Sequence, residues 1–191
     1  MELNELLRGC RTYRRFLQEP VEEAVVREAL DNARTATSAA NLQPLYYVAV
    51  TGEETVKAMQ PLVKWAAYLP PEQGTPKADE TPTAFIVMVK HDFANAFSDV
   101  DVGIAAHTIA LSAWNHGVGC CMMGAINIPE IRKLLDIDEK DTIRLVLALG
   151  KPAHSSKIVP VGEDGSIKYY LDEDRNFCVP KRAFDEVVRF A

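Results

Sequence analysis

The sequence predicts a globular domain in which helices alternate with strands, on the basis of three observations. Residues 84–89 are too uniformly apolar for an exposed sheet, so we expect a central strand that is buried on both faces. Residues 99–115 predict a long helix with almost no continuous polar face, which places this helix in the interior as well. The predicted elements follow the order helix, helix, strand, helix, strand, helix, strand, helix, strand, and then a C-terminal tail.

Length and composition indicate an ordinary soluble protein. The chain has 191 residues, of which 48% are apolar and 25% charged, and we expect a single domain over residues 1–191. The net charge of −6 argues against binding to nucleic acid or to an anionic membrane, so the expected partner is a small molecule. The acidic, polar start and the lack of a long apolar run predict a cytoplasmic protein with no signal peptide and no membrane span.

The first part of the chain predicts helices around one strand. Residues 3–9 predict a short amphipathic helix, and Pro20 opens a second helix that runs to about Arg34 with an apolar stripe. Residues 45–51 are rich in Tyr and Val and predict a strand, after which residues 53–68 return to helix.

The later elements surround the long helix. Prolines in residues 69–83 predict an extended surface loop that is mobile or covers a pocket. Asp99 or Asp101 can cap the long helix, whose polar side chains form a narrow seam along which another backbone could lie: Asp101, Thr108, Ser112 and Asn115. Glycines end this helix and flank a short apolar strand or turn at residues 118–125, where backbone can approach a flat ligand. The rest predicts a helix at 129–135, a buried strand at 142–149, a turn at 162–165, a strand at 167–170 and a helix at 183–189.

Arginines are concentrated near the start, in Arg11-Thr12-Tyr13-Arg14-Arg15-Phe16 beside Arg8. One interpretation is a solvated loop whose arginines pair with surface carboxylates. The other is an anion site, because guanidinium groups suit phosphate oxygens and the Thr12 hydroxyl can add a hydrogen bond. The residues alone leave both interpretations open.

A second unusual stretch, Ser38-Ala39-Ala40-Asn41-Leu42-Gln43-Pro44, is a loop of small residues that ends in two amides and a proline. Asn41 and Gln43 each supply a donor and an acceptor, which suits the edge of a heterocycle with alternating C=O and N–H groups. The alternative is that both amides only stabilise the turn.

Several familiar kinds of site are not expected. Neither GxGxxG nor GxxxxGK[ST] follows a strand, and GxSxG and HExxH are absent. The cysteines show no zinc spacing and are interpreted as reduced, buried residues: Cys10, Cys120, Cys121 and Cys178. The histidines are scattered and are interpreted as structural or exposed: His91, His107, His116 and His154. We therefore expect no metal site and no catalytic side chain.

Three motifs together resemble the FMN-dependent nitroreductase family. Residues 11–16 resemble its N-terminal R-[ST]-x-[RK]-x-F signature, and residues 38–44 resemble its S-x-x-N-x-Q-P loop. Residues 101–119 are similar to its core helix and the turn beyond, and Val179-Pro180-Lys181-Arg182 is similar to the basic end of many members. Because the motifs occur in the family's order and spacing, the chain is identified as a member.

The resemblance implies an α+β, nitroreductase-like fold with a central mixed β-sheet flanked by helices. It also implies an intertwined homodimer that forms through the core helix and binds two FMN molecules at its interface. It places the FMN phosphate near Arg11, Thr12 and the pair Lys181 and Arg182, with the pair coming from the other subunit. Arg14 would lie by flavin N1 and the C2 carbonyl, where a cation stabilises the anionic reduced flavin. The remaining implied contacts are Asn41 and Gln43 at the pyrimidine or ribityl edge, Ser38 and Ala39 through backbone and hydroxyl, Lys77 as a second cation near N1, and the backbone N–H groups of Met123 and Gly124 near N5 and O4.

The implied activity is that of an NAD(P)H-dependent flavin oxidoreductase. NADH or NADPH would pass hydride to flavin N5, and a flat, electron-poor acceptor such as a nitroaromatic or a quinone would then take its place, which is ping-pong chemistry. Many members have a second arginine at the position of Cys10, a larger polar residue near Gly124 and a helical lid where this chain has the loop 69–83. The identity of the acceptor is therefore not implied. The alternatives are a flavin-binding or flavin-sensing module with little turnover and a cofactor-free interaction domain.

Overall fold

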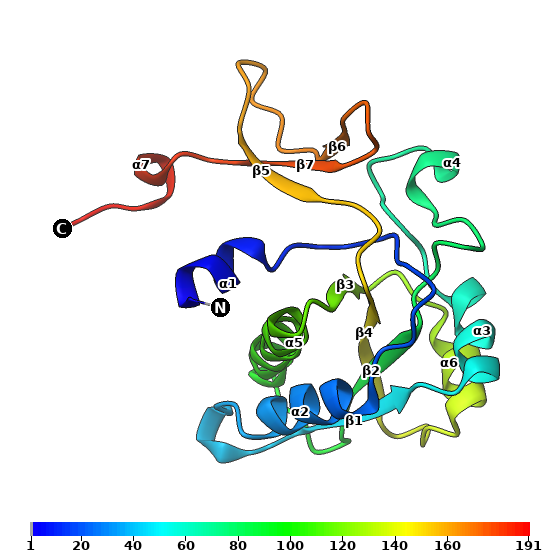
Figure 1. Ribbon diagram of the computed structural model, residues 1–191. Coiled ribbons are helices and arrows are strands. Elements are labelled where there is room, and N and C mark those ends of the chain that lie inside the picture. Colours follow the sequence, from blue (N-terminus) through cyan, green and yellow to red (C-terminus); the bar gives the residue numbers. More distant parts are fainter. Residues whose placement is uncertain (1) are drawn as a thin grey trace.

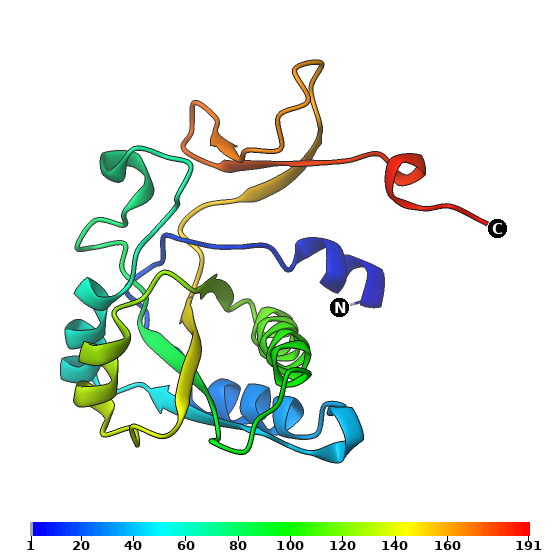
Figure 2. The same ribbon diagram turned by 180° about the vertical axis from the view of Figure 1, so that it is seen from behind.

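The computed structural model describes residues 2–191 and shows three layers, with a four-stranded sheet between two pairs of helices (Figures 1 and 2). Helices α2 (Glu23–Arg34) and α5 (Ser98–Asn115) cover one face of the sheet. Helices α3 (Glu53–Met59) and α6 (Ile128–Leu135) cover the other face. Helices therefore flank a central sheet, as the sequence predicts.

The central sheet consists of β1 (Leu45–Val50), β2 (Ala84–Lys90), β3 (Gly119–Met123) and β4 (Thr142–Gly150), in the order β1-β2-β4-β3. Each of these pairings is antiparallel. A parallel bridge between Thr12 and Cys120 adds the segment after α1 (Leu3–Gly9) to the β3 edge, so parallel and antiparallel pairing meet there. This edge brings the arginine-rich segment to the sheet.

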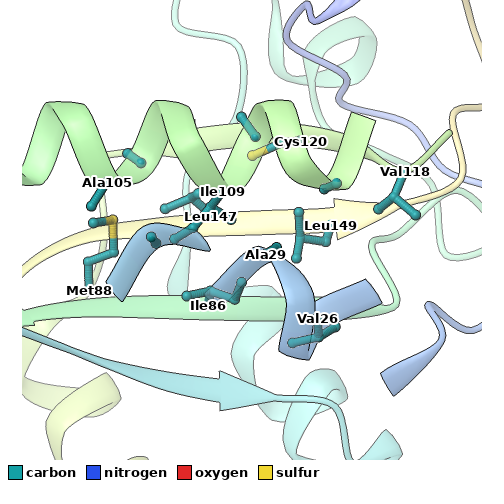
Figure 3. Close-up of a cluster of buried hydrophobic side chains, with 14 of the residues drawn as sticks. Val26, Ala29, Ile86, Met88, Ala105, Ile109, Val118, Cys120, Leu147 and Leu149 are labelled. Carbon is teal, nitrogen blue, oxygen red and sulfur yellow. The ribbon is translucent and has the colours of Figure 1, made fainter. Parts of the chain in front are cut away.

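Strand β2 is central and buried up to Val89, which confirms the prediction for residues 84–89. Successive side chains of a strand point to opposite faces, so Ile86 and Met88 pack under α2 and α5 (Figure 3). Phe85, Val87 and Val89 pack toward α3 and α6. Full burial of one such side chain stabilises the fold by about 1.5–3 kcal/mol.

Helix α5 matches the predicted long helix, but neither predicted aspartate caps it. Phe97 occupies the N-cap position, and Asp101 lies one turn inside the helix, where its carboxylate accepts hydrogen bonds from the loop after α2. The Ser112 hydroxyl in the polar seam accepts a hydrogen bond of 3.0 Å from Asn32 of α2, so the second backbone along the seam is α2. Gly117, with a φ of +73°, ends the helix in the left-handed region that favours glycine.

Two predicted helices are shorter than expected. Helix α2 begins at Glu23 rather than Pro20, because the Gln18 side chain and the Glu19 carbonyl bind residues 81–83 and hold the preceding chain extended. The helix predicted over residues 53–68 ends with α3 at Met59 and the 3-10 turn η2 (Gln60–Leu62). Val63 then pairs with Ile126 in an isolated bridge. The predicted loop 69–83 contains a short helix, α4 (Pro71–Gly74).

The C-terminal tail forms a second sheet that the sequence does not predict. Strand β7 (Phe177–Lys181) pairs in parallel with β5 (Ser156–Pro160) and antiparallel with β6 (Tyr170–Leu171). The turn at residues 162–165 is confirmed, but the strand predicted at 167–170 is wrong, since only Tyr170 is paired. The predicted final helix is reduced to α7 (Phe184–Val187), which extends away from the three layers (Figures 1 and 2). Between residues 2 and 191, no helix is both long and apolar enough to cross a bilayer.

Candidate functional site

The arginine-rich segment lies directly against β3. The Tyr13 backbone N–H donates to the Cys120 carbonyl over 2.9 Å, next to the Thr12 bridge. The Tyr13 ring packs over Gly119 so closely that a Cβ there would lie 2.8 Å from the ring. Gly119 is therefore required by packing of this segment. The two regions that the sequence links to a ligand, one before residue 20 and one after residue 115, are neighbours.

A cavity of about 240 Å³ opens where these regions meet the C-terminal strand β7. Arg11 and Thr12 enter it from the first region, Met122 from β3 and Lys181 from the end of β7. Its other lining residues are Cys10, His107, Ala110, Cys120 and Val179. Three predicted site residues, Arg11, Thr12 and Lys181, thus share one cavity, and none of the nine lining residues is acidic. The expectation that Lys181 comes from the other subunit is corrected, because the end of β7 brings it to the Arg11 cavity within one chain.

Arg11 has hydrogen-bonding capacity to spare in this cavity. One terminal nitrogen donates to the Leu7 carbonyl over 3.0 Å, whereas its Nε is buried and has no partner. A buried donor without a partner costs about 1–3 kcal/mol. Arg11 also lines the cavity, where its guanidinium supplies positive charge for an anion such as a phosphate group. The residues present therefore fit a phosphate.

Met122, rather than Met123, presents its side chain to this cavity. Met122 is 41% exposed, whereas Met123 is 4% exposed and belongs to the core under α3 and α6. Strand alternation predicts that neighbours point to opposite faces, but the sequence does not show which methionine points outward. The resemblance implies a contact through the Met123 backbone N–H, so the direction of its side chain does not change that prediction. Gly124 is exposed, and no atom lies within 4 Å of where its Cβ would be.

The loop with the two amides lies beside Asp101, near the N-terminal end of α5. The Ser38 hydroxyl donates to Asp101 over 2.8 Å, and the Gln43 backbone N–H donates to Ser38 Oγ over 3.0 Å. Ser38, Gln43 and Asp101 line a small cavity of about 80 Å³. Within one chain, the structure does not bring this loop to the cavity of Arg11. Ser38, Ala39, Asn41 and Gln43 therefore form a separate cluster.

This loop has a strained backbone. Ala40 and Asn41 of the 3-10 turn η1 (Ala39–Asn41) and the following Gln43 have φ values of 53°, 53° and 50°, in the left-handed region that side chains other than glycine rarely adopt. Asp101, which is 4% exposed, holds the loop by accepting from the Ser38 hydroxyl and the Ala39 N–H. Strain of about 1–3 kcal/mol for each residue persists only where surrounding contacts impose it, and such sites are often functional.

Arg14 lies outside the cavity of Arg11. Its guanidinium lies 4.4 Å from the centroid of the Tyr169 ring and 4.7 Å from that of Phe177. Its backbone N–H donates to Nε2 of His154 over 3.0 Å. Burial lowers the pKa of His154 to about 4, so this imidazole is neutral at pH 7. The aromatic rings therefore hold the Arg14 cation in one place.

The two other predicted cations lie elsewhere. Lys77 lines a separate open cavity of about 440 Å³, together with Arg175 and Asp172. Arg182 follows Lys181 and is exposed. Arg15, which the sequence does not single out, is buried and donates to the Arg175 carbonyl, while Arg175 pairs with Glu80 over 3.1 Å. These contacts join the second sheet to the chain around residue 80.

Buried thiols line part of the site, and no metal cluster accompanies them. Burial raises the pKa values of Cys10 and Cys120, so both thiols are neutral at pH 7. All four cysteines are free and buried, as predicted. Among residues 2–191, no three His, Cys, Asp or Glu side chains are grouped as metal ligands would be.

The fold and the site together describe one kind of protein. Its central sheet is flanked by helices and has a cavity at the β3 edge that is lined by cations and by no carboxylate. Residues 7–151 match the Nitroreductase family, so the chain belongs to that family. The match confirms the predicted family and, with the layers described above, the α+β fold class.

Similar proteins agree with this assignment. An NADPH-dependent oxidoreductase of Staphylococcus aureus (strain MRSA252) is 20% identical over 97% of this chain and 76% of its own length. An FMN-dependent nitroreductase of Clostridium difficile R20291 is 19% identical and superposes with a TM-score of 0.70 over 98% of both chains. A nitroreductase-like protein of Streptococcus mutans is 18% identical, with a TM-score of 0.65 over 81% of this chain and 90% of its own. The two solved structures share the fold of this chain.

Proposed function

We propose that this chain is an FMN-dependent oxidoreductase that uses NADH or NADPH to reduce a flat, electron-poor acceptor such as a nitroaromatic or a quinone. The supporting observation is the cavity that gathers Arg11, Thr12, Met122 and Lys181 from three distant parts of the sequence. The S. aureus relative is named for NADPH and the C. difficile structure for FMN, and both names agree with the proposal.

The residues of the cavity suit one end of FMN. Arg11 and Lys181 supply positive charge for the phosphate, and the Thr12 hydroxyl adds a hydrogen bond. The exposed side chain of Met122 offers an apolar surface to the ring system. We assign Arg14, whose guanidinium packs against the rings of Tyr169 and Phe177, as the cation beside flavin N1 and the C2 carbonyl. When bound, FMN supplies the hydride-transfer chemistry, alternating between nicotinamide and acceptor.

We propose that a second copy of the chain completes the site. Ligand pockets usually have volumes of about 300–1,000 Å³, and the cavity of about 240 Å³ is smaller than this range. Within one chain, the loop of Ser38 and Gln43 lines a different cavity from that of Arg11. A partner could bring that loop, with Ala39 and Asn41, to the flavin edge.

Exposed apolar surface also supports a homodimer. Val100 and Ile104 lie one turn apart on the outer side of α5 and are 57% and 36% exposed. In the C-terminal tail, Phe184 and Phe190 are 62% and 86% exposed. Large exposed apolar surfaces usually mark interfaces. The role of Lys77, the single domain over residues 1–191 and the cytoplasmic location stay predictions.

The visible spectrum of the purified protein tests this function directly. We expect a yellow protein whose flavin is reduced anaerobically by NADH or NADPH, and which oxidises nicotinamide in the presence of menadione or nitrofurazone. Flavin binding without nicotinamide oxidation would favour the flavin-binding module instead. A colourless protein that does not take up added FMN would refute the flavin assignment.

Arg11→Ala tests the phosphate assignment. Loss of a charge-assisted hydrogen bond costs about 1.5–3 kcal/mol, so FMN affinity should fall roughly tenfold or more. Arg8→Ala is the matched control, because Arg8 is exposed on α1 and does not line the cavity. Full FMN affinity in Arg11→Ala would contradict the placement of the phosphate.

A further inference from the structure

His107 lines the cavity of Arg11 from the middle of α5. The sequence presents it as one of four scattered histidines, and its function is not indicated by any motif. The structure places this exposed side chain in the same cavity as Arg11, Thr12 and Lys181. The other histidines have different surroundings: His116 contacts Glu28 over 3.0 Å, His91 lies 3.8 Å from Asp141, and His154 packs between aromatic rings.

The charges facing His107 favour an anion. Arg11 and Cys10 face the cavity from the segment after α1, Cys120 from β3 and Lys181 from β7, while α5 itself adds Ala110. Both thiols are neutral, so two permanent cations remain among these groups, with no carboxylate to neutralise them. An anion in this cavity can therefore interact with both cations and with the His107 imidazole.

We propose that His107 is a further ligand of the FMN phosphate and makes the affinity for FMN depend on pH; this inference rests on the proposed function. A protonated imidazole donates two N–H groups and adds a positive charge, whereas a neutral one donates a single hydrogen bond. Histidine changes its charge between about pH 5 and pH 8. A phosphate ester keeps most of its second negative charge above about pH 6. FMN should therefore bind more tightly as pH falls from 8.5 to 6.5.

Riboflavin provides the comparison that isolates the phosphate. It has the same ring and ribityl chain as FMN but no phosphate, so the ratio of the riboflavin Kd to the FMN Kd measures the phosphate contribution. We expect this ratio in the wild-type protein to rise roughly threefold to tenfold between pH 8.5 and pH 6.5. Quenching of flavin fluorescence by flavin-free protein measures both Kd values without any turnover.

Substitutions at one position separate charge from packing. The His107→Gln variant should show no pH dependence of this ratio of Kd values. At pH 6.5 its ratio should lie close to the value at pH 8.5. His107→Lys should keep a high ratio at both pH values, because its charge does not titrate in this range. His116→Gln, which removes an exposed histidine at the end of the same helix, should behave like the wild-type protein.

Failure of this inference is distinct from failure of the proposed function. If the wild-type protein binds neither flavin, the proposed function is wrong. If it binds FMN and His107→Gln shows the wild-type ratio and pH dependence, the role of His107 is refuted while the function stands. Circular dichroism of each variant verifies its fold, and His107→Lys supplies a second, independent variant at this exposed position.

Discussion

Mild acid should destabilise the protein through His154. The ring of this histidine packs 5.5 Å from the Tyr13 ring and 4.9 Å from the Phe177 ring, between centroids. Its Nε2 accepts from the Arg14 N–H, and its Nδ1 contacts the Ser155 carbonyl at 2.8 Å, so the neutral form satisfies both ring nitrogens. Burial lowers its pKa from 6.5 to about 4, with smaller contributions from Arg15 and Arg14. Between these two values the unfolded chain binds more protons, so stability falls as the pH decreases.

The pKa difference sets the size of the effect. From pH 7 to pH 5, proton uptake by the unfolded state at this single group lowers the free energy of unfolding by about 2 kcal/mol. The full stabilisation is present above pH 6.5 and is lost as the pH falls toward 4. Urea unfolding at pH 7, 6 and 5, followed by fluorescence of Trp65 and Trp114, measures it at one protein and one flavin concentration.

His154→Gln isolates this contribution, because its amide does not titrate. The variant should be less stable at pH 7, but its loss of stability between pH 7 and pH 5 should be about 2 kcal/mol smaller than that of the wild-type protein. His116→Gln, on the surface beside Glu28, is the control and should retain the wild-type pH dependence. If His154→Gln loses as much stability on acidification as the wild-type protein, the argument from burial is wrong.

Two further predictions follow from packing. Gly119→Ala should lower the free energy of unfolding by about 1–3 kcal/mol, because its Cβ would lie 2.8 Å from the Tyr13 ring and 2.9 Å from Pro152; an unchanged urea midpoint would contradict this. Cys121 should react with a thiol reagent only after unfolding, because it is free and buried and, unlike Cys10 and Cys120, does not line the cavity; absorbance of the released thiolate measures the rate. Rapid reaction of the native protein at Cys121, whose pKa burial raises to about 11, would show that the β3 edge opens.

The sequence predicts the elements whose pattern is local. Residues 84–89 are apolar at every position, and only a strand between two others buries both faces, as β2 does between β1 and β4. Helix α5 and its end at Gly117 are equally clear from composition and a glycine stop. In the tail, polar and apolar residues do not alternate regularly over residues 156–160, and the pairing of this strand with β7 depends on a contact about 20 residues away. The pattern of the tail alone therefore does not reveal this second sheet.

In the candidate site, too, the sequence predicts residues that belong to a local motif but not those whose position depends on packing. Arg11 and Thr12 are visible as a motif, and they do share a cavity with Lys181. Met122 and His107 are missed, because only the packed sheet and helix decide which side chains of β3 and α5 face outward. The motif spacing also gives no sign that Ser38 lies beside Asp101 and away from Arg11, since that separation is a property of the folded helix.

The separation of these two clusters along α5 leads to a specific geometry for the proposed dimer. Asp101, beside the Ser38 loop, and Ala110, in the cavity of Arg11, are about 13 Å apart at the rise of an α-helix. A two-fold axis that brings Asp101 of each chain to Ala110 of its partner must pass beside α5 near the midpoint of these two residues, and Ile104 is the exposed apolar residue next to that point. Ile104→Cys should therefore form a disulfide with its own copy on mild oxidation, seen as a dimer on a non-reducing gel. Arg27→Cys, on the exposed side of α2, should stay monomeric on that gel. If light scattering shows a dimer that Ile104→Cys does not cross-link, the axis lies elsewhere, and the Ser38 loop does not meet the partner's cavity in this way.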